Sequence, residues 1–178
     1  FQRRNLKLFE IGKSFIGGGE GQLPSEPRLL TIALTGAEVA SSTVADGRGL
    51  DLFDAKAAIE SVAATLGIVT PEFRLSNAKH LTIGRSADIY VDGVFAGTVG
   101  RLKDEIASNY KFKRDVFVGE ILLDVLLAAT PEAVVYKPLP RFPGVSRDVT
   151  FGVDRNFEYS SLANAATTDD SLFDGSKL

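Results

Sequence analysis

The chain has 178 residues, of which 44% are hydrophobic and 24% are charged, a composition typical of a soluble globular protein. Its formal net charge of −3 excludes a protein-wide positive field for nucleic acid, so any RNA contact must come from a local cluster of Lys and Arg. The absence of cysteine excludes disulfides and thiol catalysis and fits a reducing compartment. We expect a cytoplasmic protein with no membrane-spanning segment. Because the chain begins with Phe1 and contains no methionine, we expect it to be a fragment.

The first predicted elements are two strands. LKLFEIGKSF (6–15) alternates apolar and polar residues and runs into a glycine-rich segment at 17–21, and RLLTIALTG (28–36) has the composition of a second strand that ends at Gly36. The glycine-rich segment lacks the spacing and the lysine of a phosphate-binding loop. It is therefore predicted to be a connection between strands.

A helix is predicted next, because Asp51 is a suitable N-cap and Gly67 a suitable left-handed stop. Four apolar residues fall on one face at helical spacing: Ala55, Ile59, Val62 and Leu66. Asp51 and Asp54 could be read as a carboxylate pair for acid/base work. Their place at the start of the helix favours capping instead.

Beyond the helix, SADIYVDGVFAGTVG (86–100) places Asp92-Gly93 between two β-rich runs and predicts a tight antiparallel hairpin. A short helix is predicted over 103–110, and 114–129 reads as a strand that leads into another short helix. Strands and helices do not alternate strictly. We therefore expect an α+β fold, an antiparallel or mixed sheet with helices packed against it.

The segment 136–148 carries three prolines and is predicted to be a stiff linker at a domain boundary. A strand over 149–154 and a short helix over 159–167 follow. These two elements are predicted to begin a second unit, for which few residues remain.

Two further polar residues have structural interpretations. His80 is the only histidine and has no cysteine or second histidine to join it in a metal site or a catalytic pair, so a structural or solvent-exposed role is favoured. Arg85, beside Gly84 at the start of the predicted hairpin, is suited to hold a carboxylate or a carbonyl in the loop.

A basic and aromatic patch lies on and just after the linker. Lys137, Arg141 and Arg147 are interleaved with Tyr136 and Phe142, a combination that can meet RNA phosphates and bases. The same side chains could instead hold the two domains together. The residues alone leave these two interpretations open.

Four segments, in this order, resemble the last part of the bacterial phenylalanyl-tRNA synthetase beta subunit: LFEIGKSF (8–15), DLFDAKAAIE (51–60), GRSADIYVDGVFAGTVGRL (84–102) and YKPLPRFPGVSRDVTFGVD (136–154). The resemblance implies a non-catalytic, class II synthetase-like antiparallel sheet flanked by helices over 1–136 and a proline-rich linker over 137–146. It also implies the start of a ferredoxin-like anticodon-binding domain over 147–178.

The resemblance further implies a role in phenylalanine–tRNA ligase, which attaches phenylalanine to its tRNA with ATP and magnesium. Catalysis would belong to the alpha subunit, which pairs with the beta subunit as a heterotetramer of two alpha and two beta chains. We expect no catalytic residue and no cofactor in this fragment, which would serve subunit assembly and tRNA docking through Lys137, Arg141 and Arg147. The alternative is a protein-interaction module without RNA binding.

The chain departs from the family pattern in two places. The family usually has a Gly-Glu-Leu-His-Pro stretch after the hairpin, whereas this chain reads GRLKD (100–104). The terminal domain is reduced to the residues after the linker, so it is expected to be incomplete.

Overall fold

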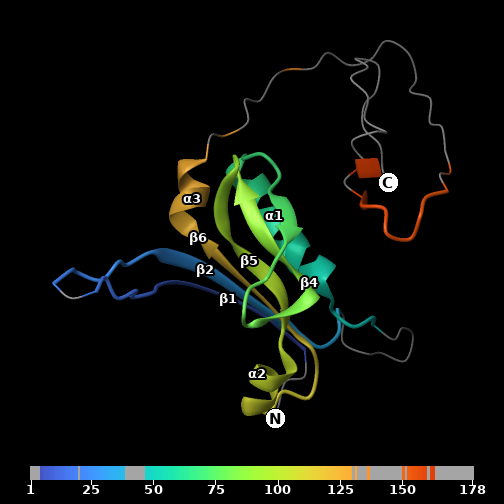
Figure 1. Cartoon of the computed structure of the whole chain (residues 1–178), viewed down its shortest axis with the longest axis horizontal. Coiled ribbons are helices and arrows are strands. Elements are labelled where there is room, and N and C mark those ends of the chain that lie inside the picture. The colour runs from blue at the N-terminus through green and yellow to red at the C-terminus, as the bar shows by residue number, and fades with distance from the viewer. Residues whose placement is uncertain are drawn as a thin grey trace. The chain divides into compact units, whose positions relative to one another are not determined.

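The computed structural model describes residues 5–19, 21–38, 47–129, 131, 136, 150, 152–159 and 161–162. The chain divides into two compact units, Phe1–Val134 (unit 1) and Val135–Leu178 (unit 2). In its described part, unit 1 contains three helices and one six-stranded sheet of order β1-β2-β6-β5-β4-β3 (Figure 1). In chain order the elements are β1 (Leu6–Lys13), β2 (Arg28–Thr35), α1 (Leu52–Leu66), β3 (Glu72–Leu75), β4 (Leu81–Val91), β5 (Val94–Leu102), α2 (Asp104–Asn109), β6 (Val116–Leu122) and α3 (Leu123–Ala128).

Every neighbouring pair of strands in this sheet is antiparallel, which confirms the α+β class and the antiparallel arrangement. The predicted hairpin is β4–β5. Asp92 and Gly93 both have positive φ, 50° and 74°, as the tight turns that suit the twist of paired strands require. β4 begins at Leu81, before the predicted start, because a shift of register between Leu81 and Ser86 allows pairing on both sides of the irregularity.

Helix α1 begins and ends where the sequence predicts. The Asp51 side chain accepts hydrogen bonds from the backbone N–H groups of Phe53 and Asp54, and the Asp54 side chain accepts from the Asp51 N–H, so a complete capping box is present. Gly67 ends the helix with a φ of 69°. The predicted apolar face is buried at Ala55 and Ile59, whereas Leu66 lies at the helix end and is 39% exposed.

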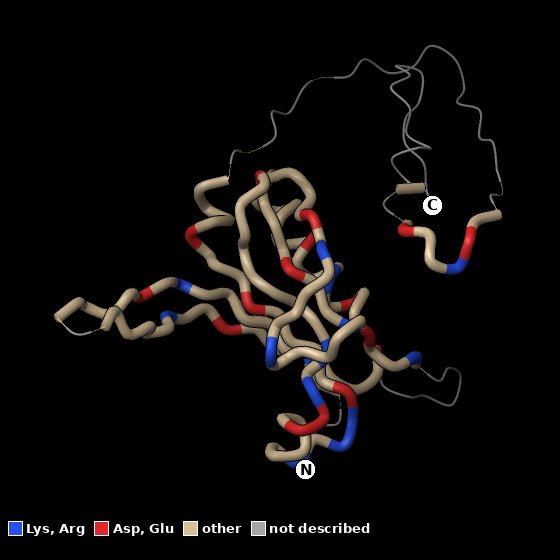
Figure 2. The backbone as a smooth tube through the Cα atoms, viewed as in Figure 1, with Lys and Arg blue, Asp and Glu red and all other residues tan. Residues whose placement is uncertain are grey.

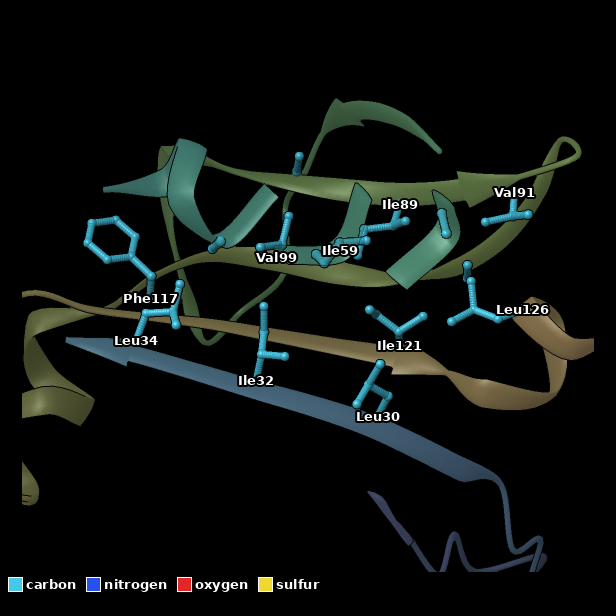
Figure 3. Close-up of a cluster of buried hydrophobic side chains, with 14 of the residues drawn as sticks. Leu30, Ile32, Leu34, Ile59, Ile89, Val91, Val99, Phe117, Ile121 and Leu126 are labelled. Atoms are coloured by element: carbon cyan, nitrogen blue, oxygen red, sulfur yellow. The ribbon is translucent and has the colours of Figure 1, made fainter. Parts of the chain in front are cut away.

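The core lies between α1 and one face of the sheet (Figure 3). Its residues come from β2, β4, β5, β6, α1 and α3, and Ile59, Ile89 and Ile121 are among the most completely buried. Gly119 of β6 lies directly under Ile32 and Ile59, where a Cβ would be only 2.9 Å from Ile32 Cγ1. This glycine therefore allows the helix and β2 to pack closely on β6.

The hairpin of β1 and β2 projects beyond the rest of the sheet (Figure 1). Past Lys13 it continues through an antiparallel bridge between Ile16 and Ser25, whose backbone groups exchange two 2.9 Å hydrogen bonds. The predicted connection between the two strands is therefore an extended arm with Gly19 and Gly21, both of positive φ, close to its tip. We call Phe15–Leu23 together with β1 the hairpin arm.

In unit 2 the strand predicted over 149–154 is wrong at the described residues Gly152, Val153 and Asp154, which are irregular and lead into a turn. A strand needs a neighbouring strand to satisfy its backbone groups, and the described residues of unit 2 contain no strand that could pair with this segment. Tyr159, Ser161 and Leu162 are helical, at the start of the predicted helix.

Candidate functional site

The predicted basic patch cannot be placed, because Lys137, Arg141, Arg147 and Phe142 lie outside the described residues. Tyr136 is described and exposed.

The acidic pair at the start of α1, Asp51 and Asp54, has a structural role as a helix cap. Arg48 Nη2 lies 2.6 Å from Asp54 Oδ1, and this hydrogen bond, with a further one from the Asp51 N–H, lowers the pKa of Asp54 to about 2 although partial burial opposes the shift. A carboxyl with so low a pKa is a poor general base at neutral pH. The capping interpretation is supported, with Arg48 as a partner that the sequence did not reveal.

The other polar residues singled out from the sequence also have structural surroundings. The His80 carbonyl accepts a 3.0 Å hydrogen bond from the Lys103 N–H, which ties the start of β4 to the end of β5. Arg85 Nη1 lies 3.8 Å from Asp115 Oδ2, with both side chains about half exposed, a weak ion pair. Arg85 does face a carboxylate, as the sequence suggested.

The turn after the hairpin, where this chain departs from the family pattern, is organised by Arg101. Its Nη2 lies 2.6 Å from Asp104 Oδ1 and 2.9 Å from Asp115 Oδ1, while the side chain is only 15% exposed. The two carboxylates raise the pKa of Arg101, chiefly through the hydrogen bond to Asp115. The guanidinium thus joins β5, α2 and the start of β6, and its own charge is fully neutralised.

The hairpin arm carries an unusual number of exposed apolar side chains. They are Leu8, Phe9, Ile11, Phe15, Ile16 and Leu23. Single exposed apolar residues are normal on a monomer, but a group on one projecting element marks an interaction surface. The sequence pattern alone did not identify this surface.

The register explains why these side chains are exposed. Phe9 and Ile11 pair with Ile32 and Leu30, so they point to the same face of the sheet as the core. Helix α1 packs on β5, β6 and β2 but does not cover β1, and Phe9 remains 75% exposed. β1 is also an edge strand, whose outer backbone groups have no partner among the neighbouring strands of the sheet.

Within the described residues there is no group of three or more His, Asp or Glu side chains that could hold a metal ion. The helices of the same part of the chain are too short or too polar to cross a membrane.

Residues 1–123 match the family model described as the phenylalanyl tRNA synthetase beta chain CLM domain. The match covers well over half of the chain. The chain belongs to this family. In family terms, the described sheet, α1 and the hairpin arm all fall within the synthetase beta chain CLM domain.

Curated relatives agree with this assignment. The phenylalanine–tRNA ligase beta subunit of Staphylococcus aureus strain Mu50 is 33% identical over 161 residues, which is 90% of this chain and 20% of the relative. That of Staphylococcus epidermidis is 34% identical over 158 residues, 89% of this chain and 20% of the relative. The chain thus spans about a fifth of the length of these relatives.

Among solved structures, pyrrolysyl-tRNA synthetase from Desulfitobacterium hafniense superposes with a TM-score of 0.47 at 14% sequence identity. The superposition covers 71% of this chain and 42% of that chain.

Two features of this CLM domain, the Arg101 ion pair and the exposed apolar residues of the hairpin arm, left a pattern in the sequence that our sequence-based predictions did not use. Arg101, near the end of β5, and Asp104, at the start of α2, are opposite charges on either side of a two-residue turn. Phe15, Ile16 and Leu23 flank a glycine-rich turn, where the apolar residues of an isolated hairpin have little to cover them.

Proposed function

We propose that this chain is a non-catalytic assembly and tRNA-docking part of a phenylalanine–tRNA ligase beta subunit. Membership of the synthetase beta chain CLM family supports this role. The holoenzyme would use ATP and magnesium to join phenylalanine to its tRNA in the cytoplasm. The reaction would take place in the alpha subunit, within a complex of two alpha and two beta chains.

The hairpin arm is the observation that carries the assembly role. Its apolar side chains are exposed on both faces of a strand pair, because successive residues of a strand point to opposite sides: Leu8 faces one way, and Phe9 and Ile11 face the other. Covering such a projection removes apolar area from water at about 25 cal/mol per Å². A protein partner that packs along both faces would therefore gain more than one that meets a flat surface.

The domain arrangement is part of the proposal. Residues 1–136 would form a class II synthetase-like core without catalytic residues, and 137–146 a stiff linker. Residues 147–178 would begin a ferredoxin-like anticodon-binding domain. Lys137, Arg141 and Arg147 would contact tRNA phosphates from this linker region, where prolines reduce the entropy lost on docking.

The assembly role is tested by placing charges on the arm. In a beta subunit co-expressed with the alpha subunit, Phe9→Glu combined with Phe15→Glu should reduce the recovered complex at least about tenfold, since burying an unpaired carboxylate in an apolar contact costs well over the 1.4 kcal/mol that this factor represents. The measurement is the amount of alpha subunit that co-purifies with an affinity-tagged beta subunit.

Leu75→Glu is the matched control, because Leu75 is an 81% exposed apolar residue on β3, the opposite edge strand of the same sheet. It should assemble normally. Circular dichroism of each variant would verify that the sheet is formed. If the arm variant assembles as well as the Leu75 variant, the arm does not hold the alpha subunit and the assembly role is wrong.

A further inference from the structure

We propose that residues 110–114, with the sequence YKFKR, form a second RNA-binding surface, specific for unpaired bases, at the end of α2. This surface would add to the proposed tRNA-docking role. Only the identification of its RNA as tRNA rests on that proposed function. It is separate from the linker residues Lys137, Arg141 and Arg147.

Two exposed aromatic rings form the centre of this surface. Tyr110 is 71% exposed and Phe112 46% exposed, and their ring centroids are 6.0 Å apart with an interplanar angle of 29°. The rings therefore stand side by side and nearly parallel, with ring area open to solvent. An unpaired base can stack on such a ring, whereas the bases of a duplex are already stacked on each other.

The backbone holds the two rings in this arrangement. Lys111 adopts a left-handed conformation with φ 59°, so the chain reverses between Tyr110 and Phe112. The Phe112 N–H donates to the Ala107 carbonyl at 3.0 Å, and the Lys111 N–H donates to the Ser108 carbonyl at 2.9 Å. This is the pattern of a Schellman helix end, in which glycine is the favoured residue at the left-handed position. A lysine in this position places a positively charged residue between the two aromatic residues in the chain, at the cost of local strain.

Three exposed cations lie next to the two rings in the chain. Lys111, Lys113 and Arg114 are exposed and form no ion pair with any described residue; Arg114 only donates a 3.3 Å hydrogen bond to Asn5 Oδ1. The nearest acid in sequence, Asp115, is already paired with Arg101 at 2.9 Å. In Figure 2, blue segments lie on either side of α2, whose first turn carries the acidic residues Asp104 and Glu105. Three free cations within four residues can meet consecutive phosphates of one strand.

The surface is also hollowed. A depression of about 240 Å³ is lined by residues from the end of β5, from α2 and from the segment up to the start of β6. Its two acidic lining residues, Asp104 and Asp115, are paired with Arg101, which also lines it. Phe112 thus lines a recess in which Lys113 and Arg114 are the cations outside these ion pairs. Rings, recess and cations together fit a strand whose bases stack while its phosphates meet Lys and Arg, the usual combination for single-stranded nucleic acid.

The test measures binding of the 178-residue chain to a fluorescently labelled 12-nucleotide single-stranded RNA by anisotropy, with the same RNA in duplex form as a second probe. The chain should prefer the single strand. Tyr110→Ala with Phe112→Ala should weaken single-strand binding at least about tenfold, because a stacked base contributes roughly 1–3 kcal/mol by alanine substitution. Tyr110→Leu with Phe112→Leu, which keeps apolar packing and so protects the fold, should show a similar loss.

Neutralising the cations should act differently from removing the rings. Replacing Lys111, Lys113 and Arg114 by Gln should weaken binding. It should also lower the slope of log affinity against log salt by about two, because each phosphate contact on a single strand contributes roughly 0.7 to that slope. Lys56→Gln with Phe53→Ala is the matched control, since it removes an exposed aromatic ring and a nearby lysine on α1. This control should leave RNA binding unchanged.

Three results would overturn the proposal: equal affinity for single strand and duplex, an unchanged affinity in the Leu variant, or equal competition by a polyglutamate peptide. The last result would identify a surface for acidic proteins. Because these measurements need no alpha subunit, their failure is distinguishable from failure of the assembly role, which is tested by co-purification.

Discussion

Replacing Gly119 by Ala tests how closely α1 and β2 pack on the sheet. The new Cβ would lie 2.9 Å from Ile32 Cγ1, 3.2 Å from Ile32 Cδ1 and 3.5 Å from Ile59 Cδ1. Since carbon atoms are in optimal contact at about 3.5–4.0 Å, the neighbouring side chain must move by roughly 0.5–1 Å. Such overpacking costs about 1–3 kcal/mol, and the lower entropy of the unfolded alanine chain returns about 0.5–1 kcal/mol. We expect a net loss of about 1–2 kcal/mol in the free energy of unfolding.

Urea unfolding of the 178-residue chain, followed by far-ultraviolet circular dichroism, would measure this loss. Gly12→Ala is the matched control, because Gly12 also lies in a strand but its added Cβ would meet only Glu10 Oε1, at 3.7 Å. It should be neutral or stabilising by up to about 1 kcal/mol.

A double-mutant cycle sharpens the same prediction. Ile32→Ala alone should cost about 2–5 kcal/mol, but in that background Gly119→Ala should cost nothing or be stabilising, since the atoms in the way are gone. If the two changes add within about 0.5 kcal/mol, Ile32 is not the side chain that limits the space above Gly119 and the reasoning is refuted.

Two further predictions concern charge. Because Arg48 lowers the pKa of Asp54 from 3.8 to about 2, Asp54 contributes stability above its unfolded pKa, and this contribution should be lost as pH falls from 3.8 through 2. Urea unfolding at pH 4, 3 and 2 should show a shallower decline for Asp54→Asn than for the unaltered chain, and parallel curves would contradict this. In the proposed complex with the alpha subunit, replacing Lys137, Arg141 and Arg147 by Glu should weaken tRNA binding, lower the slope of log affinity against log salt by about two and spare phenylalanine activation, as measured by filter binding and pyrophosphate exchange. Equal loss of both activities would identify domain-holding residues instead.

Elements with local signals could be predicted from the sequence. Asp51 and Gly67 mark the ends of α1 because capping depends on residues within one turn of each end. Asp92-Gly93 marks the β4–β5 turn because positive φ at two successive residues suits few residue types. Such signals require no knowledge of the rest of the chain.

Elements that depend on distant partners could not be predicted. β3 is only four residues long, and its extended conformation is stabilised by pairing with β4, where Phe73 lies opposite Ile89. Arg48 is only six residues before Asp54, but their ion pair depends on the path of the backbone between Arg48 and the N-cap Asp51, which no capping pattern specifies. Phe9 is exposed because α1 packs on the sheet only as far as β2. The alternation of apolar residues within β1 does not show where the helix will lie.

The YKFKR segment and the part of the hairpin arm beyond β1 lie at opposite ends of β1. Arg114 contacts Asn5, immediately before the strand, whereas Phe15 follows its other end. An eight-residue strand at about 3.3 Å per residue separates them by roughly 25 Å. β1 is held along its length by pairing with β2, so this distance is maintained by a rigid ladder of hydrogen bonds. A protein partner that covers the arm beyond β1 therefore leaves the YKFKR segment accessible, so that, under the two proposals, one CLM domain would hold a subunit and an RNA strand at the same time.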